Sequence, residues 1–63
     1  MKRIELKDLP DGTQFHLIPN KENLSYTKIS RCKEFRAFSI VKKEGDDKEM
    51  KMLNRYVYVG GNL

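Results

Sequence analysis

The chain has 63 residues, of which 13 are Lys or Arg and 9 are Asp or Glu, giving a net charge of +4. A chain of this length forms one domain with a thin core, and it has little room for the roughly 300 Å³ pocket on which most enzymes depend. The charge is spread evenly, since residues 1–31 hold six basic and four acidic side chains and residues 32–63 hold seven and five. Such dispersion is typical of an ordinary solvated surface and argues against one concentrated nucleic-acid-binding face.

The single cysteine, Cys32, excludes an intramolecular disulfide and any zinc site built from several cysteines. The first residues contain no apolar run of the kind that a signal peptide needs, and nowhere do about 18 apolar residues follow one another. We therefore expect a protein of the reducing cytoplasm that has no membrane partner.

The first third of the chain predicts strands around one tight turn. Residues 4–6 are expected to pair with the chain end or to cover the mouth of a barrel. Residues 10–12 read Pro-Asp-Gly, which is turn chemistry because Pro fixes φ for the second position of a turn, Asp bonds its own backbone and Gly accepts a positive φ afterwards. Residues 13–17 alternate with a period of two, which directs Phe15 to the inside and His16 to solvent.

Polar segments separate the later candidate strands. Residues 19–23 and 44–48 predict polar loops, and residues 60–63 predict a flexible tail on a single domain that spans 1–63. Between these segments, runs rich in β-branched and aromatic residues predict strands at 25–29, 35–42 and 56–59.

Residues 48–54 admit two interpretations. Met50 and Met52 alternate as in a strand, whereas Met50 and Leu53 are spaced as on a helical turn. We favour a strand, with one short helical turn as the alternative.

Four or five short strands in about sixty residues are too few for two stacked sheets with a filled interior, so the sheet must curl on itself. The sequence therefore predicts a mainly β protein, either a small curled sheet or a partly open barrel of the SH3-like or OB-like type.

One segment resembles a known pattern. Residues 6–17 read as L-x-D-L-P-x-G-T-x-F-x-L, and residues 26–29 read as Y-x-K-I. This combination resembles the opening of small uncharacterised bacteriophage and prophage proteins, in which it looks like the first hairpin of an SH3-like barrel. The resemblance covers about the first half of the chain. It implies a fold and a phage or prophage origin, and it implies no activity.

Residues suited to catalysis or metal binding are few and isolated. His16 is the only histidine, and Cys32 has no recognisable partner base. The acidic residues around Gly45 lack the ligand order of a calcium loop and are interleaved with Lys43 and Lys48. We therefore expect no enzyme activity, no cofactor and no metal.

The third predicted strand is apolar on both faces. Phe35, Ala37 and Val41 alternate to one side, and Phe38 and Ile40 to the other. A small curled sheet buries only one of these sets, which leaves the other for a partner. The alternative is an overwound or helix-capped barrel that covers both sets internally.

The last predicted strand has the same surplus, because two valines there oppose two tyrosines, and only one pair can face a core. The candidate partner-binding residues are these surplus side chains and the cations near them, namely Phe38, Ile40, Tyr56, Tyr58, Arg36, Lys28 and Arg55.

These features favour a non-catalytic binding module that acts by protein–protein contact, with a host protein or a second copy of the chain as its partner. A phage-encoded modulator of a host protein, or an inhibitor of host defence, would work in this way. One alternative is a small basic nucleic-acid-binding barrel, because rings and cations together also bind single strands. Another is a structural component of a virion. The dispersed acidic residues favour the protein partner.

Overall fold

The computed structural model of the protein describes residues 1–20 and 24–60. The chain runs in order through β1 (Lys2–Glu5), a 3-10 turn η1 (Leu6–Asp8), β2 (Gln14–Phe15), β3 (Tyr26–Arg31), β4 (Phe38–Lys43), β5 (Glu49–Leu53) and β6 (Tyr56–Val59). Residues 21–23 of the predicted polar loop and residues 61–63 of the predicted tail lie outside the described residues.

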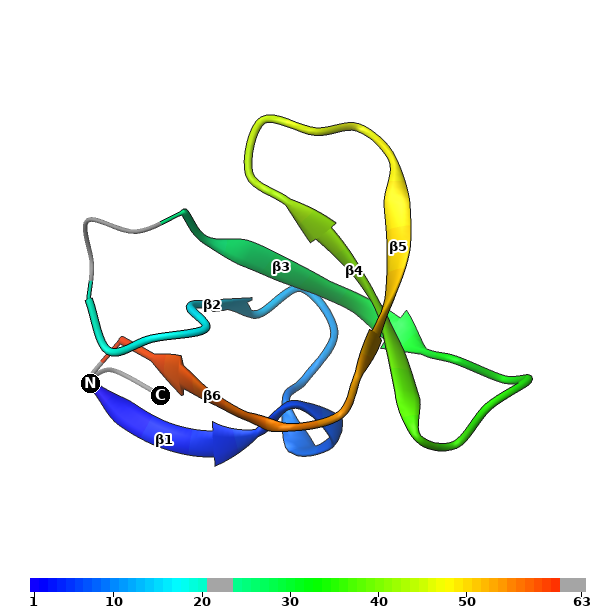
Figure 1. The fold of residues 1–63 in the computed structure, drawn as a ribbon, viewed down its shortest axis with the longest axis horizontal. Coiled ribbons are helices and arrows are strands. Elements are labelled where there is room, and N and C mark those ends of the chain that lie inside the picture. The colour runs from blue at the N-terminus through cyan, green and yellow to red at the C-terminus, as the bar shows by residue number, and fades with distance from the viewer. Residues whose placement is uncertain (21–23, 61–63) are drawn as a thin grey trace.

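The strands form two antiparallel sheets. β1 pairs with β6, and the other sheet has the order β2-β3-β4-β5. A bridge between His16 and Tyr58 connects the two sheets, so the strands follow one another as β1-β6-β2-β3-β4-β5 (Figure 1). No pairing closes β5 onto β1 within residues 1–20 and 24–60. The predicted mainly β class and the small curled sheet are confirmed.

Strand pairing decides two alternatives that the sequence left open: strand or helical turn at residues 48–54, and the position of residues 4–6. The segment at 48–54 forms β5, a strand, and the one short helical turn of the described chain is η1. Ile4 lies opposite Val57 in the β1–β6 pair, as expected for a chain start that pairs with the chain end.

The Pro-Asp-Gly segment forms a tight turn. Thr13 N–H donates to Pro10 O at 3.2 Å, and Gly12 has φ of +89° at the third position, where a side chain would be strained. Pro10 is thus the first residue of the turn, and the second position predicted for it is wrong, because the closing hydrogen bond ends on its own carbonyl. A second turn at residues 43–46 has the same form, with Gly45 at φ of +82°.

The core lies between the two sheets. Its fully or nearly fully buried members come from β2, β4, β6 and the η1 region, namely Leu6, Leu9, Phe15, Val41, Val57 and Val59. The Phe15 ring stacks on Tyr26 with centroids 5.6 Å apart. The inward direction predicted for Phe15 is confirmed, and in β6 the valines and not the tyrosines face the core.

The predicted strand at 35–42 begins later than expected. β4 starts at Phe38, whose N–H donates to Phe35 O at 3.1 Å and so closes a turn immediately before the strand. Phe35 and Ala37 therefore do not share the inner face with Val41, and both are exposed. Within β4 the predicted alternation holds: Val41 is buried, whereas Phe38 and Ile40 are half-buried on the opposite face.

His16 was expected to face solvent, and this expectation is wrong. Its backbone pairs with Tyr58, with both N–H to O distances at 2.8 Å, which draws the residue between β2 and β6. The side chain is half-buried, and its Nδ1 has no hydrogen-bond partner among the described residues.

No helix in the described ranges has the length and apolarity needed to cross a membrane.

Candidate functional site

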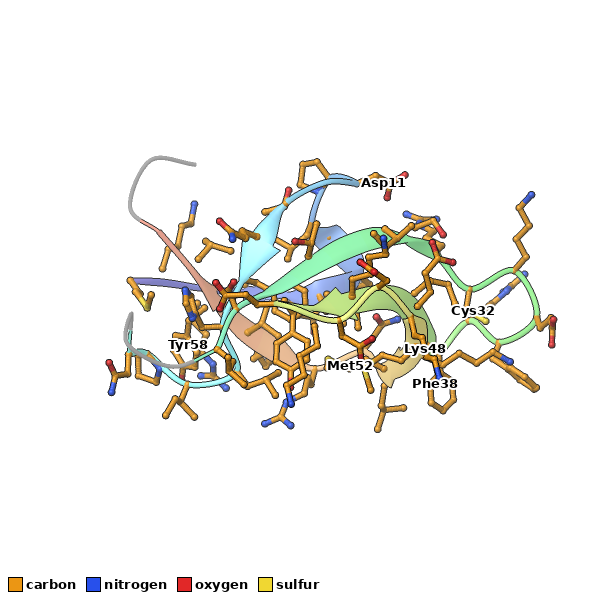
Figure 2. The ribbon with its side chains drawn as sticks, turned by 90° about the horizontal axis from the view of Figure 1, so that it is seen from above. Asp11, Cys32, Phe38, Lys48, Met52 and Tyr58 are labelled. Atoms are coloured by element: carbon orange, nitrogen blue, oxygen red, sulfur yellow. The ribbon has the colours of Figure 1, made fainter. Side chains whose placement is uncertain are left out.

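The predicted partner-binding residues lie in two separate regions. Figure 2 shows Phe38 and Cys32 toward one end of the long axis and Tyr58 toward the other. Phe38, Ile40 and Arg36 belong to β4 or to the turn before it, whereas the two tyrosines belong to β6 in the smaller sheet. The structure therefore does not unite the predicted set in one surface.

An exposed apolar patch surrounds Phe38. Phe38 lies opposite Leu53 in the β4–β5 pair, and its ring meets the Phe35 ring edge-on with centroids 6.1 Å apart. Ile40 follows on the same face of β4. We call these four residues the Phe38 patch. Leu53 is 56% exposed and Phe35 is 51% exposed, so the patch presents its outer members to solvent.

Positive charge borders this patch. Lys51 lies between the patch and the exposed acid Glu34: its Nζ is 5.1 Å from the Phe35 ring centroid and 3.7 Å from Glu34 Oε2. It is also the cross-strand neighbour of Ile40. A cation over an aromatic face is attracted by the ring quadrupole. The patch therefore combines an apolar centre with a cationic margin.

Asn54 holds the turn that carries Phe35. Its backbone N–H donates to Ala37 O at 2.7 Å, and its side-chain Nδ2 donates to Arg36 O at 3.1 Å. The Oδ1 of the same side chain accepts from the Ser39 hydroxyl at 2.6 Å, and Ser39 is fully buried. One amide side chain thus ties the 33–37 turn to the start of β4, which fixes the position of Phe35 relative to Phe38.

A cavity of about 400 Å³ opens beside the same turn. Its lining consists of three cations, one aromatic ring and two small or polar side chains, namely Lys7, Arg31, Arg36, Phe38, Cys32 and Asn54. Among the described residues, no acidic side chain lines it. Lys7 is paired with Glu5 at 3.3 Å, whereas Arg31 and Arg36 form no ion pair within the described part of the chain. Two uncompensated guanidinium groups beside a ring make this cavity suited to an anion. We call it the cationic cavity.

Lys28 was expected among the exposed cations, and this expectation is wrong. The register of β3 against β4 shifts after Lys28, and the residue lies opposite the buried Val41 on the inner face. The lysine is 2% exposed, and its Nζ donates to Leu9 O at 2.6 Å and Lys7 O at 3.2 Å. Burial lowers the pKa of Lys28, although the nearby Asp11 carboxylate acts in the opposite direction. Lys28 is a structural residue that holds the η1 region against β3.

The remaining predicted residues form a different surface. Tyr56 is exposed, and the Arg3 guanidinium lies over its ring at 4.1 Å from the centroid. Tyr58 is half-buried opposite Arg3 in the β1–β6 pair. Arg55 is exposed between β5 and β6, and its carbonyl accepts from Leu6 N–H at 2.9 Å. Here the aromatic ring of Tyr56 already has a cationic neighbour within the chain.

Sequence reasoning missed several members of both sites. Phe35 and Leu53 complete the Phe38 patch, and Lys7 and Arg31 complete the cationic cavity. A hairpin register between β4 and β5 would have revealed Leu53, because antiparallel partners share a face. No sequence signal places Lys7 beside Arg31, since 24 positions separate them and only the fold brings them together.

Among the described residues, no group of three or more His, Cys, Asp or Glu side chains could hold a metal ion. Compared with family models, curated proteins and solved structures, the chain matches none of them. The resemblance to phage and prophage proteins therefore stays a prediction.

Proposed function

We propose that the chain is a non-catalytic binding module that acts by protein–protein contact through the Phe38 patch. The supporting observation is the outward presentation of Phe35 and Leu53 on either side of the Phe38 ring. Aromatic and aliphatic side chains that gather in this way on a small monomer are typical of an interface centre.

The margin of the patch indicates the chemistry of the partner. Lys51 and Arg36 border the apolar centre, and both are exposed. The complementary surface is apolar in its middle and acidic at its rim, because opposite charges at a rim favour encounter and correct orientation. An apolar patch with a cationic margin would be sufficient for a phage-encoded modulator that acts in the cytoplasm by covering a surface of a host protein.

The direct test compares two leucines of similar exposure. Leu53→Ser, combined with Phe35→Ser, removes the outer members of the patch, and Leu24→Ser changes a leucine that is 51% exposed elsewhere. Tagged wild type and variants are used for affinity capture from a host-cell lysate with quantitative mass spectrometry. We expect a protein that wild type and Leu24→Ser capture and that the patch variant loses at least about tenfold, which corresponds to about 1.4 kcal/mol.

Circular dichroism must show that the patch variant keeps the wild-type strand content. The proposal is contradicted if the folded patch variant captures the same proteins as wild type, or if wild type captures none above a tag-only control.

The cationic cavity supports a second candidate function, the binding of single-stranded nucleic acid. Arg31 and Arg36 could contact phosphates while the Phe38 ring stacks on a base. The test is a fluorescence anisotropy titration with a labelled single-stranded oligonucleotide at several salt concentrations. If both arginines contact phosphate, Arg31→Gln with Arg36→Gln should reduce the log–log salt slope by roughly 1.4, and Lys33→Gln should leave it unchanged. Absence of binding at low salt would remove this candidate.

A further inference from the structure

β5 is an edge strand with one free side. Its pairing partner is β4, and no other strand in residues 1–20 and 24–60 pairs with it. Figure 1 shows β5 at the outer side of the β4–β5 hairpin, with the connecting loop directed away from β1 and β6. An edge of this kind presents backbone N–H and C=O groups that another strand can satisfy.

The hydrogen-bond pattern identifies which residues have these free groups. Asn54 N–H donates to Ala37 O, so this pair is of the hydrogen-bonded type. Hydrogen-bonded and non-hydrogen-bonded pairs alternate along an antiparallel ladder. Met52 and Met50, opposite Ser39 and Val41, therefore bond to β4. The backbone groups of the intervening residues, Glu49, Lys51 and Leu53, point to the free side.

The side chains of these three residues, one acidic, one basic and one apolar, discriminate between the registers of a β5–β5 pair. Two copies related by a two-fold axis can be centred on Met50, Lys51 or Met52 and still use the free groups. Centring on Lys51 places two lysines directly opposite each other, which is destabilising. Centring on Met52 places Lys51 opposite Leu53, a contact without charge attraction. Centring on Met50 places Glu49 opposite the Lys51 of the other copy, and does so twice.

The Met50-centred register also covers apolar surface on the inner face. Met50 is 46% exposed, and Met52 follows it on the same side of β5. At the axis the two Met50 side chains meet in a non-hydrogen-bonded pair, where opposed side chains approach most closely. Flexible thioether side chains adapt well to such a contact. The arrangement is therefore self-complementary in charge, in backbone hydrogen bonding and in apolar contact.

We propose that two copies of this chain associate through antiparallel β5–β5 pairing centred on Met50. The pairing joins the two four-stranded sheets into one continuous sheet. The Glu49–Lys51 contacts select the register, because a lysine in the middle of an edge strand opposes pairing unless an acid faces it. This inference does not rest on the Phe38 patch, and the two surfaces are tested with different substitutions.

The test exchanges the two charges that face each other. Lys51→Glu gives acids at both positions, and Glu49→Lys gives lysines at both positions, so each variant alone has two repulsive pairs in place of two attractive ones. Sedimentation equilibrium at low salt should show wild type approaching twice the chain mass of 7.4 kDa as concentration rises. The dissociation constant of each single variant should be weaker by about tenfold or more.

Two rescue experiments distinguish pairing from a general effect of the substitutions. An equimolar mixture of the two single variants should form mixed dimers, because acids then face lysines at both positions. The exchanged variant that carries both Glu49→Lys and Lys51→Glu should dimerise as wild type does. Lys33→Glu, the same charge change on an exposed residue outside β5, should leave the wild-type dissociation constant unchanged.

Three results would overturn the inference: a wild-type chain that stays monomeric up to millimolar concentration, single variants that dimerise like wild type, or a failure of both rescues. In each case the Phe38 patch remains open to its own test, because Leu53→Ser and Phe35→Ser leave Glu49 and Lys51 in place.

Discussion

β5 and β6 are separated by two residues, and the same period-two alternation leads to opposite outcomes in them. In β6 the alternating valines, Val57 and Val59, are fully buried. In β5 the alternating Met50 is 46% exposed, although Met52 is half-buried. The sequence pattern alone does not explain this difference.

Neighbouring strands do explain it. β6 has β1 on one side and the His16 bridge on the other, and its valines point into the space closed by Phe15 and Leu6. β5 has β4 on one side and no strand pairing on its other side within the described chain. The buried core therefore lies around β6, whereas β5 has a free edge and the adjacent turn exposes apolar side chains. Three sets of substitutions test this division.

The largest effect is expected from a matched pair of phenylalanines. Phe15 is fully buried in the core, and Phe35 is half exposed beside β5. Phe15→Ala should lower the free energy of unfolding by about 3–5 kcal/mol, because it removes a buried ring and leaves a cavity. Phe35→Ala should lower the free energy of unfolding by roughly 0.5 kcal/mol or less, because substitutions at exposed positions usually change stability little. Urea denaturation measures both, and equal losses would refute the division.

The next effect concerns Lys28, the buried cation. Lys28→Met keeps an unbranched side chain one atom shorter than that of lysine, but leaves the carbonyls of Leu9 and Lys7 without their donor. An unsatisfied buried acceptor costs about 1–3 kcal/mol, so we expect a loss of about 2 kcal/mol at pH 7. The control is Lys33→Met, which replaces an exposed lysine and should change stability little.

The difference in stability between wild type and Lys28→Met should depend on pH, and the direction follows from the lowered pKa of Lys28. Burial lowers the pKa of Lys28 from its ordinary value of 10.5, so between the lowered pKa and 10.5 the unfolded chain binds more protons than the folded chain. The Lys28 contribution to stability therefore increases as pH rises through that window. The stability advantage of wild type over Lys28→Met should grow with pH there, and an advantage that stays constant or shrinks would contradict the burial of a charged amine.

The smallest effect is expected at Asn54, which holds the turn beside the Phe38 patch. Asn54→Ala leaves the buried Ser39 hydroxyl without its acceptor and releases the turn at Arg36, for a loss of about 1–2 kcal/mol. The Phe38 amide, which bonds within that turn, should exchange its hydrogen faster in the variant. A double-mutant cycle with Ser39→Ala should give a coupling energy of at least about 0.5 kcal/mol, and additive losses would show that the two side chains act independently.

Much of the fold could be predicted because the relevant signals are local. Alternation in residues 13–17 places Phe15 inside, and the glycine of the Pro-Asp-Gly segment has the positive φ that such a turn requires. The strand at 56–59 could also be predicted from a local signal, because its valines and tyrosines alternate and only one of the two pairs can face a core. The late start of β4 was missed because the turn closed by Phe38 and Phe35 depends on Asn54, a residue of the β5–β6 connection that is distant in sequence.

The candidate sites were predicted only in part. Phe38, Ile40 and Arg36 could be named as candidates because their surplus apolar or cationic character is visible in the chain. Lys28 was misplaced because its partners are backbone carbonyls of η1 and the residue after it, and no side-chain pattern marks a carbonyl that lacks a donor. Lys7 and Arg31 were missed because a cavity depends on which segments meet.

The sequence by itself determined the β class, the two turns that contain Gly12 and Gly45, and the inward direction of Phe15 and Val41, because backbone sterics and side-chain alternation act between near neighbours. Only the tertiary structure decided which strand has a free edge, which lysine is buried and which cations share a cavity. Those properties depend on contacts between distant segments, and the order of strands in the sheet sets them.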